Sequence, residues 1–128
     1  MRLLLDTHAL LWVLEDNPRL SRRAAAALGD PEVEKLVSAV SAFEICRKYE
    51  LGKLPGAAAL AEAFVDTIAA IDCTPLPISL AHAALAGGLD IAHKDPFDRL
   101  LIAQARFERV PIVSNEKLFD AFGVERIW

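Results

Sequence analysis

Four acidic residues occupy positions where carboxylates could do chemistry. Asp6 directly follows an apolar run, and Glu116 lies just past a second apolar run later in the chain. Glu44 and Asp98 each fall in the first turn of a predicted helix. In an open parallel sheet, binding sites form beyond the carboxyl ends of the strands, where the following helices begin. We therefore expect these four side chains to converge in one pocket.

The chemistry of such a cluster depends on a cation. Clustered carboxylates raise one another's pKa values unless a cation lies between them. Ligands that are all oxygen favour a hard divalent ion, so Mg²⁺ is expected, with Mn²⁺ as its substitute. Cys46 and Cys73 are far apart, and the three histidines lack the paired spacing of a softer metal site. The implied reaction is displacement at phosphorus, in which one or two ions activate water and stabilise the developing charge.

The same acidic residues also have structural interpretations. Ser41 and Glu44 have the spacing of a helix capping box, and that pattern alone favours capping over catalysis for Glu44. Glu116 could simply stabilise the first turn of its own helix through the helix dipole. A helix cap explains Asp6 only weakly, so a purely structural role is hardest to defend for this residue.

Two aspartates lie together at the start of one predicted helix. Asp95 precedes Pro96 and is predicted to be the N-cap, with the proline at the first helical position. Asp98 repeats the capping pattern three residues later, so one of the two aspartates is expected to be structural. Asp95 is therefore an accessory candidate for the site beside Asp98.

Predicted strands and helices alternate between these candidates. The strands are predicted at residues 2–5, 36–40, 74–78, 111–113 and 124–128. The helices are predicted at residues 8–15, 21–29, 41–51, 57–71, 79–88 and 95–107, with a short one after residue 116. This alternation predicts an α/β fold whose mainly parallel sheet is covered by helices. The apolar run at 2–5 predicts a strand buried on both faces, and two prolines place the 74–78 strand at an edge.

Length and composition indicate one folded domain. The chain has 128 residues, of which 54% are hydrophobic and 25% are charged, so a single domain spanning 1–128 is expected. The formal net charge of −4 argues against tight nucleic-acid binding by the whole surface. An enzyme that holds phosphate through a metal ion or a local basic patch remains compatible with it. Arg47, Lys48 and Lys53 could form such an RNA-binding patch, although a solvated charged face is the default interpretation.

Nothing in the sequence indicates a membrane segment or export. The N-terminal apolar run is interrupted by Asp6 and His8, and no small-residue cleavage site follows it. No segment is long and apolar enough to span a bilayer. With two cysteines and no export signal, reduced thiols in a cytoplasmic protein are expected.

Four segments together carry a resemblance to a known family. In chain order they read LLLDTHALLW, SAFEICRKYELGKL, HKDPFDRLLIAQA and PIVSNEKLF, and they cover nearly the whole chain. The set resembles a PIN domain, specifically the VapC-type toxin ribonucleases of toxin–antitoxin pairs. The resemblance implies a three-layer α/β fold and an endoribonuclease that uses Mg²⁺ or Mn²⁺ to cleave RNA. It places the metal-binding carboxylates on Asp6, Glu44 and Asp98, with Asp98 preferred over Asp95 because it directly precedes RLLIAQA.

One turn departs from the family pattern. The family's fourth acidic residue usually sits in a Thr-x-Asp turn, where this chain has Ser114, Asn115 and Glu116. The longer glutamate moves the carboxylate by one methylene, so Glu116 is expected to reach the metal only through water, with Ser114 and Asn115 as accessory candidates. The resemblance also implies an antitoxin protein that masks the site, and a homodimer. The mean hydropathy of +0.31 is compatible with both partners.

Two other functions remain open on the sequence alone. An aspartate-nucleophile phosphatase also begins with an apolar strand and an aspartate, but its Asp-x-Asp pattern has a second aspartate where this chain has His8. A non-catalytic α/β binding module would use the carboxylates as helix caps and an apolar face for docking. Such a module predicts no effect of Mg²⁺ or Mn²⁺ on the melting temperature, whereas a metal site present only in the folded state must stabilise the fold.

Overall fold

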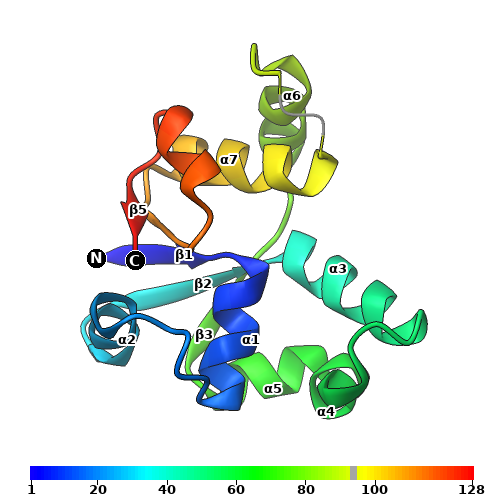
Figure 1. The fold of residues 1–128 in the computed structure, drawn as a ribbon. Helices are drawn as coiled ribbons and strands as arrows, with labels where there is room; N and C mark the ends of the chain where they lie inside the picture. The colour runs from blue at the N-terminus through cyan, green and yellow to red at the C-terminus, as the bar shows by residue number, and fades with distance from the viewer. Residues whose placement is uncertain (93–94) are drawn as a thin grey trace.

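The computed structural model describes residues 1–92 and 95–128 and shows a parallel sheet between two helical layers (Figure 1). The strands are β1 (Arg2–Leu5), β2 (Glu34–Ser38), β3 (Cys73–Leu76), β4 (Ile112–Val113) and β5 (Arg126–Ile127). The helices are α1 (Thr7–Glu15), α2 (Arg22–Gly29), α3 (Ala39–Glu50), α4 (Ala58–Glu62), α5 (Phe64–Ala70), α6 (Leu80–Gly88) and α7 (Pro96–Glu108), with 3₁₀ turns η1 (Pro55–Ala57) and η2 (Lys117–Ala121). The predicted three-layer α/β fold is confirmed. Within the described residues, no helix combines the length and the apolarity that crossing a bilayer requires.

The strand order places β1 at the middle of the sheet. The order is β3-β2-β1-β4-β5, and all neighbouring strands pair in parallel. The chain therefore builds outward from β1 to β3 and then returns to build from β4 to β5 on the other side. Such a reversal opens a crevice beyond the carboxyl ends of the middle strands, which is where α/β proteins bind ligands. β4 and β5 hold two residues each and are shorter than predicted.

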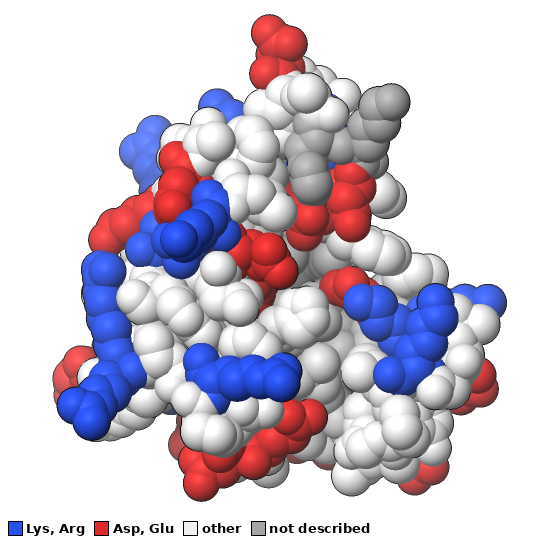
Figure 2. All heavy atoms as spheres, in the orientation of Figure 1, with Lys and Arg blue, Asp and Glu red and all other residues white. Residues whose placement is uncertain are grey.

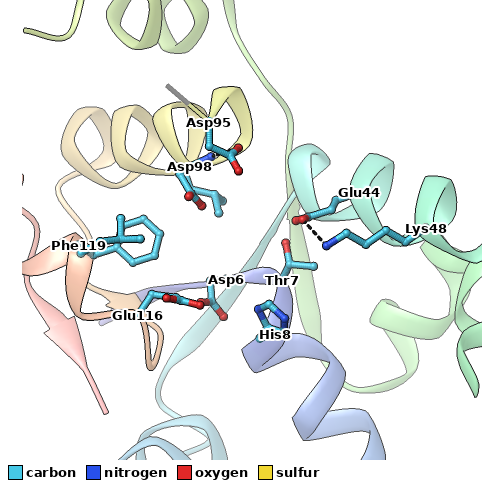
Figure 3. A pocket seen from close by; sticks show the side chains of 11 residues that line it. Asp6, Thr7, His8, Glu44, Lys48, Asp95, Asp98, Glu116 and Phe119 are labelled. Atoms are coloured by element: carbon cyan, nitrogen blue, oxygen red, sulfur yellow. Dashed lines mark hydrogen bonds and ion pairs between the residues drawn. The ribbon is translucent and has the colours of Figure 1, made fainter. Parts of the chain in front are cut away.

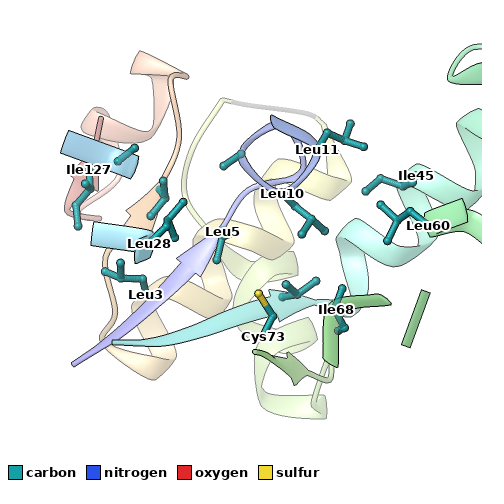
Figure 4. Packing of buried hydrophobic residues seen from close by; sticks show 14 of the residues in the cluster. Leu3, Leu5, Leu10, Leu11, Leu28, Ile45, Leu60, Ile68, Cys73 and Ile127 are labelled. Atoms are coloured by element: carbon teal, nitrogen blue, oxygen red, sulfur yellow. The ribbon is translucent and has the colours of Figure 1, made fainter. Parts of the chain in front are cut away.

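β1 is buried on both faces, as its apolar run predicts. Leu3 and Leu5 pack into a cluster with residues of α1 and α2 on one face of the sheet (Figure 4). Leu4 packs on the opposite face, in a second cluster that includes residues of α7. Each fully buried leucine contributes about 1.5–3 kcal/mol to stability. The strand, which ends at Leu5, is therefore a rigid base for the Asp6 side chain that follows it.

The start of α3 differs from the sequence prediction. β2 ends at Ser38 rather than at Val40, and Ser38 is itself the N-cap, since its Oγ accepts a hydrogen bond of 3.0 Å from the Val40 amide. Ser41 is fully buried and shares a hydrogen bond of 3.0 Å with the Thr7 hydroxyl. The predicted capping box of Ser41 and Glu44 is therefore wrong, because the helix is capped three residues earlier.

The alanine-rich segment 57–71 forms η1, α4 and α5 rather than the single predicted helix. Ala63, between α4 and α5, has φ −140° and ψ 54°, outside the helical region. The break allows Leu60 and Ile68 to pack into the same core cluster. Packing here overrides the high helix propensity of alanine.

A buried polar network connects β2 and α7. Gln104 on α7 is fully buried, accepts a hydrogen bond from the Ser38 hydroxyl and donates one of 3.2 Å to the Pro77 carbonyl. No buried side-chain nitrogen or oxygen in the described part of the chain lacks a hydrogen bond. Because Ser38 caps α3, Gln104 ties α7 to the start of the helix that carries Glu44.

His82 of α6 extends this network to the far end of α7. Its Nδ1 accepts a hydrogen bond of 3.1 Å from the Ser79 amide, which leaves the proton on Nε2, 3.2 Å from Glu108 Oε2. The other oxygen of Glu108 accepts a hydrogen bond of 3.2 Å from Arg2 on β1. The hydrogen bonds from His82 and then Arg2 hold the pKa of Glu108 below its usual value.

Arg99 fixes the start of α7 against the end of α6. Its guanidinium donates hydrogen bonds to the backbone carbonyls of Ala86, Gly87, Leu89 and Ile91. Carbonyls at the C-terminal end of a helix have no partner within the helix, so this side chain satisfies groups that α6 cannot. Asp98 directly precedes Arg99, so these hydrogen bonds also fix the position of Asp98 on α7.

Candidate active site

A cleft of about 230 Å³ lies at the carboxyl edge of the sheet, bordered by α1, α3 and α7. Five carboxylates line it, those of Asp6, Glu44, Asp95, Asp98 and Glu116 (Figure 3). The other described lining residues are Thr7, His8, Lys48, Leu101, Leu118 and Phe119. The four acidic residues expected in one pocket from the sequence therefore do share one.

Charge is distributed unevenly around this cleft. Figure 2 shows acidic side chains gathered near the centre of one face, with basic side chains beside them over α3. Of the three predicted RNA-binding residues, Lys48 lines the cleft, whereas Arg47 and Lys53 are exposed and do not. Lys48 is the only lysine or arginine among the described residues that line the cleft.

Asp6 caps α1 and is buried, with 4% of the residue exposed. Its Oδ1 accepts a hydrogen bond of 2.7 Å from the Ala9 amide. Asp6 therefore does cap α1, a role that the sequence indicated only weakly. Burial raises the pKa of the Asp6 carboxyl, and the nearby charge of Glu116 adds to the rise. Hydrogen bonds with Ser114 and Ala9, and the electrostatic effect of His8, oppose it. An ionised Asp6 is therefore destabilised unless a cation enters the cleft.

Glu44 reaches the cleft from the second turn of α3. Its Oε2 lies 2.9 Å from Lys48 Nζ, an ion pair between residues four apart along the helix (Figure 3). The Glu44 side chain is 17% exposed and that of Lys48 is 40% exposed. Since Ser38 caps α3, Glu44 is not a helix cap.

Asp95 and Asp98 have different positions at the start of α7, and only one of them caps the helix. Asp95 is the N-cap of α7, and its Oδ1 accepts hydrogen bonds from the amides of Phe97 at 2.8 Å and Asp98 at 3.3 Å. Pro96 occupies the first helical position, as predicted. Asp98 lies in the first turn, where the helix dipole favours a negative charge. The cap is therefore Asp95, and the helix does not need Asp98 for that purpose.

Glu116 enters the cleft from the turn after β4. Its amide donates a hydrogen bond of 2.9 Å to Ser114 Oγ, which holds the turn, and Ser114 is fully buried. Glu116 begins η2 without a capping hydrogen bond from its side chain. Figure 3 places its carboxylate beside that of Asp6, in agreement with the charge effect on Asp6. Asn115 is exposed and does not line the cleft.

Sequence reasoning missed two polar features of the cleft. The buried Thr7 hydroxyl pairs with Ser41 and so joins the start of α1 to α3, and its place after Asp6 is the only sequence signal for it. The ion pair between Glu44 and Lys48 was readable from their spacing, because residues four apart lie on one face of a helix. Lys48 therefore belongs to the site itself rather than to a separate basic patch.

The donor set of the cleft fits a hard divalent cation. In the described part of the chain, no three His, Cys, Asp or Glu side chains are grouped closely enough to hold a metal ion directly. The cleft is nonetheless lined by carboxylate oxygens, the ligands that Mg²⁺ and Mn²⁺ prefer. Mg²⁺ keeps several of its waters in proteins and is usually bound through one or two carboxylates. The residues present therefore suit a hydrated ion better than a closed cage of protein ligands.

Comparison with known proteins defines the class. The family model of the PIN domain matches residues 3–125, and the chain belongs to the PIN domain family. The family resemblance of the four sequence segments is thereby confirmed. No curated protein sequence matches the chain significantly.

Several solved structures share this fold. VapBC2 from Rickettsia felis, bound to a DNA fragment from their promoter, contains a chain with 14% identity and a TM-score of 0.73, with 100% of both chains covered. A toxin–antitoxin complex from Klebsiella pneumoniae gives 18% identity and a TM-score of 0.68, covering 98% of this chain and 95% of the other. FitAcB from Neisseria gonorrhoeae gives 22% identity and a TM-score of 0.62, covering 97% of this chain and 95% of the other. At these identities, the likeness shows a shared fold.

Proposed function

We propose that this PIN domain is a metal-dependent endoribonuclease. The observation that carries the proposal is the convergence of five carboxylates, from four separate segments of the chain, in one cleft at the carboxyl edge of the sheet. Like charges placed together destabilise one another unless a cation is their partner. At Asp6, burial is the main cause of the raised pKa, and the nearby charge of Glu116 adds a smaller contribution of this kind.

In this proposal, Asp6, Glu44 and Asp98 would hold a hydrated Mg²⁺ or Mn²⁺ ion, in part through its waters, and Glu116 would contact it through water alone. A bound ion of this kind neutralises charge on a phosphodiester and lowers the pKa of a coordinated water. The chain itself supplies fixed positions. The Ala9 amide orients Asp6, and the cap at Asp95 fixes the first turn that carries Asp98. Carboxylates held in this way need little reorganisation when a substrate arrives.

We further propose that the nuclease is the toxin of a toxin–antitoxin pair, with RNA as its substrate. Support comes from the fold that it shares with chains of VapBC2 and of the Klebsiella pneumoniae toxin–antitoxin complex. An antitoxin that covers the cleft and a second copy of the chain are the expected protein partners. Large apolar side chains stand exposed on the surface, including Phe43, Val65 and Leu80, and leave area for such partners.

A non-catalytic binding module is the second candidate. It is favoured by the finding that Asp6 and Asp95 both act as helix caps. It does not account for Glu44, which lies inside a helix that Ser38 caps, or for Glu116, whose side chain caps nothing. The two candidates differ in their response to metal, because an ion that binds only the folded state must raise the melting temperature.

The decisive experiment compares the parent protein with Asp6→Asn. Purified protein is incubated with a mixed pool of small RNAs in Mn²⁺, in Mg²⁺ or in chelator, and the melting temperature is recorded under each condition. Asparagine is as good an N-cap as aspartate, so α1 should remain intact. Asp30→Asn is the matched control, because Asp30 is an exposed aspartate that also accepts a backbone hydrogen bond, from the Glu32 amide.

We expect metal-dependent cleavage by the parent and by Asp30→Asn, and none by Asp6→Asn. Cleavage retained in a folded Asp6→Asn variant would refute the assignment of Asp6. Absence of both cleavage and metal stabilisation in the parent would favour the binding module.

A further inference from the structure

One cation already lies among the carboxylates of the cleft. Lys48 Nζ is 2.9 Å from Glu44 Oε2, and it is the only lysine or arginine lining the cleft within the described residues (Figure 3). Five carboxylates line the same space. The ammonium group therefore neutralises part of this acidic cluster.

The pair is built so that it can open. Lys48 is 40% exposed, and its ammonium is a compact charge on a flexible four-carbon chain. Glu44 is 17% exposed, so the pair is open to solvent on its lysine side. Ion pairs that solvent reaches are weakened by screening and by the conformational entropy lost in holding both side chains. A divalent ion carries twice the charge and competes for the same carboxylate oxygens. The ammonium group of Lys48 is thus a weak partner of the Glu44 carboxylate, and a divalent ion can displace it.

We propose that Lys48 is a built-in competitor for the metal ion, which holds Glu44 in the metal-free protein and is released when the ion binds. The released ammonium then contacts a phosphate of the bound RNA. This inference deepens the proposed function and rests on it. A phosphate that approaches five carboxylates meets repulsion unless cations face it, and the freed Lys48 supplies one such charge beside the ion.

The alternative is that Lys48 only strengthens α3 as a surface pair with Glu44. Arg47 separates these two roles, because it is the neighbouring residue on the same helix, carries the same charge and does not line the cleft. Lys48→Met and Arg47→Met change the net charge equally. A difference between them in metal affinity therefore comes from the position of the Lys48 charge in the cleft, beside Glu44.

The test is a titration of the full chain with Mn²⁺, without RNA, by calorimetry. The proteins are the parent, Lys48→Met, Arg47→Met, Lys48→Arg and Asp6→Asn. We expect Lys48→Met to bind Mn²⁺ about threefold to fivefold more tightly than Arg47→Met, which corresponds to the loss of one partly exposed ion pair. Lys48→Arg keeps the competing charge and is expected to stay close to the parent. Thermal unfolding of the variants in chelator checks that each is folded.

The outcomes separate this inference from the function on which it rests. If the parent binds Mn²⁺, Asp6→Asn does not, and the two methionine variants bind equally, then the metal site stands and the role of Lys48 is refuted. Weaker binding by Lys48→Met than by Arg47→Met also refutes it. If the parent binds no Mn²⁺, the proposed function fails first, and the inference fails with it.

Discussion

The two ends of α7 carry two different kinds of polar grouping. At its N-terminal end, Asp95 and Asp98 join three other carboxylates in a cleft whose described lining contains one lysine. At its C-terminal half, Gln104 and Glu108 belong to a network in which acceptors face donors, among them His82. The network is complementary in charge and hydrogen bonding, whereas the cleft gathers one sign of charge. Polar groups that only stabilise a fold are matched by partners of opposite charge or hydrogen-bonding character, so the difference supports the cleft as the candidate functional site.

The pKa values of two carboxyls express the same difference. Hydrogen bonds from His82 and Arg2 lower the pKa of Glu108, whereas burial, with the charge of Glu116 added, raises the pKa of Asp6. A lowered pKa means that the ionised carboxylate stabilises the folded state, and a raised one means that it destabilises that state. Shifts of the second kind, in a cleft, are typical of functional sites.

The largest effect should come from neutralising a carboxylate of the cleft. Asp98→Asn and Glu44→Gln are each expected to lower RNA cleavage by about 100-fold or more, because each removes a charge that acts at the reacting centre. The melting temperature should change little, since neither side chain caps its helix. Initial cleavage rates at saturating Mn²⁺ and thermal unfolding measure the two effects. Glu50→Gln, on the exposed end of α3, is the control and should cleave like the parent.

A smaller effect, on stability, should come from the network. Gln104→Leu leaves the Ser38 hydroxyl without its acceptor and the Pro77 carbonyl without its donor. The free energy of unfolding should fall by about 1–3 kcal/mol, the cost of leaving buried polar groups unpaired. Urea denaturation measures it, with the exposed Arg106→Met on the same helix expected to stay within about 0.5 kcal/mol of the parent. A Gln104→Leu variant as stable as the Arg106→Met control would show that the network does not stabilise the fold.

Much of the scaffold could be predicted from local sequence signals. The apolar run before Asp6 is buried on both sides of the sheet, and the pair of Asp95 and Pro96 starts α7 as expected. These features depend on a few neighbouring residues. The convergence of four acidic residues also followed, because the carboxyl ends of parallel strands share one edge of the sheet.

The rest depended on contacts between distant segments. The sequence favoured Ser41 as the N-cap of α3, whereas the observed cap is Ser38, the last residue of β2 in its pairing with β3. Ser41 is instead buried and pairs with Thr7. Gln104 lies 66 residues from Ser38 along the chain, so no local pattern could connect them. The clamp of Arg99 on the end of α6 is likewise invisible until two helices are placed side by side.

The smallest effect should be a pH dependence that differs in sign between the two regions. Glu108 has a folded-state pKa below 4.5, so its contribution to stability is full above pH 4.5 and is lost as the pH falls through the lowered value. Asp6 has a folded-state pKa above 3.8, so in chelator it destabilises the fold above the raised value and ceases to do so as the pH falls towards 3.8. In urea denaturation from neutral to acidic pH, Glu108→Gln should lose less unfolding free energy than the parent as the pH falls. The difference should be less than about 1 kcal/mol, because Glu108 is partly exposed. Asp6→Asn should instead be more stable than the parent at neutral pH and equally stable in acid. If both variants changed the pH dependence of stability in the same direction, the contrast between the cleft and the network would be contradicted.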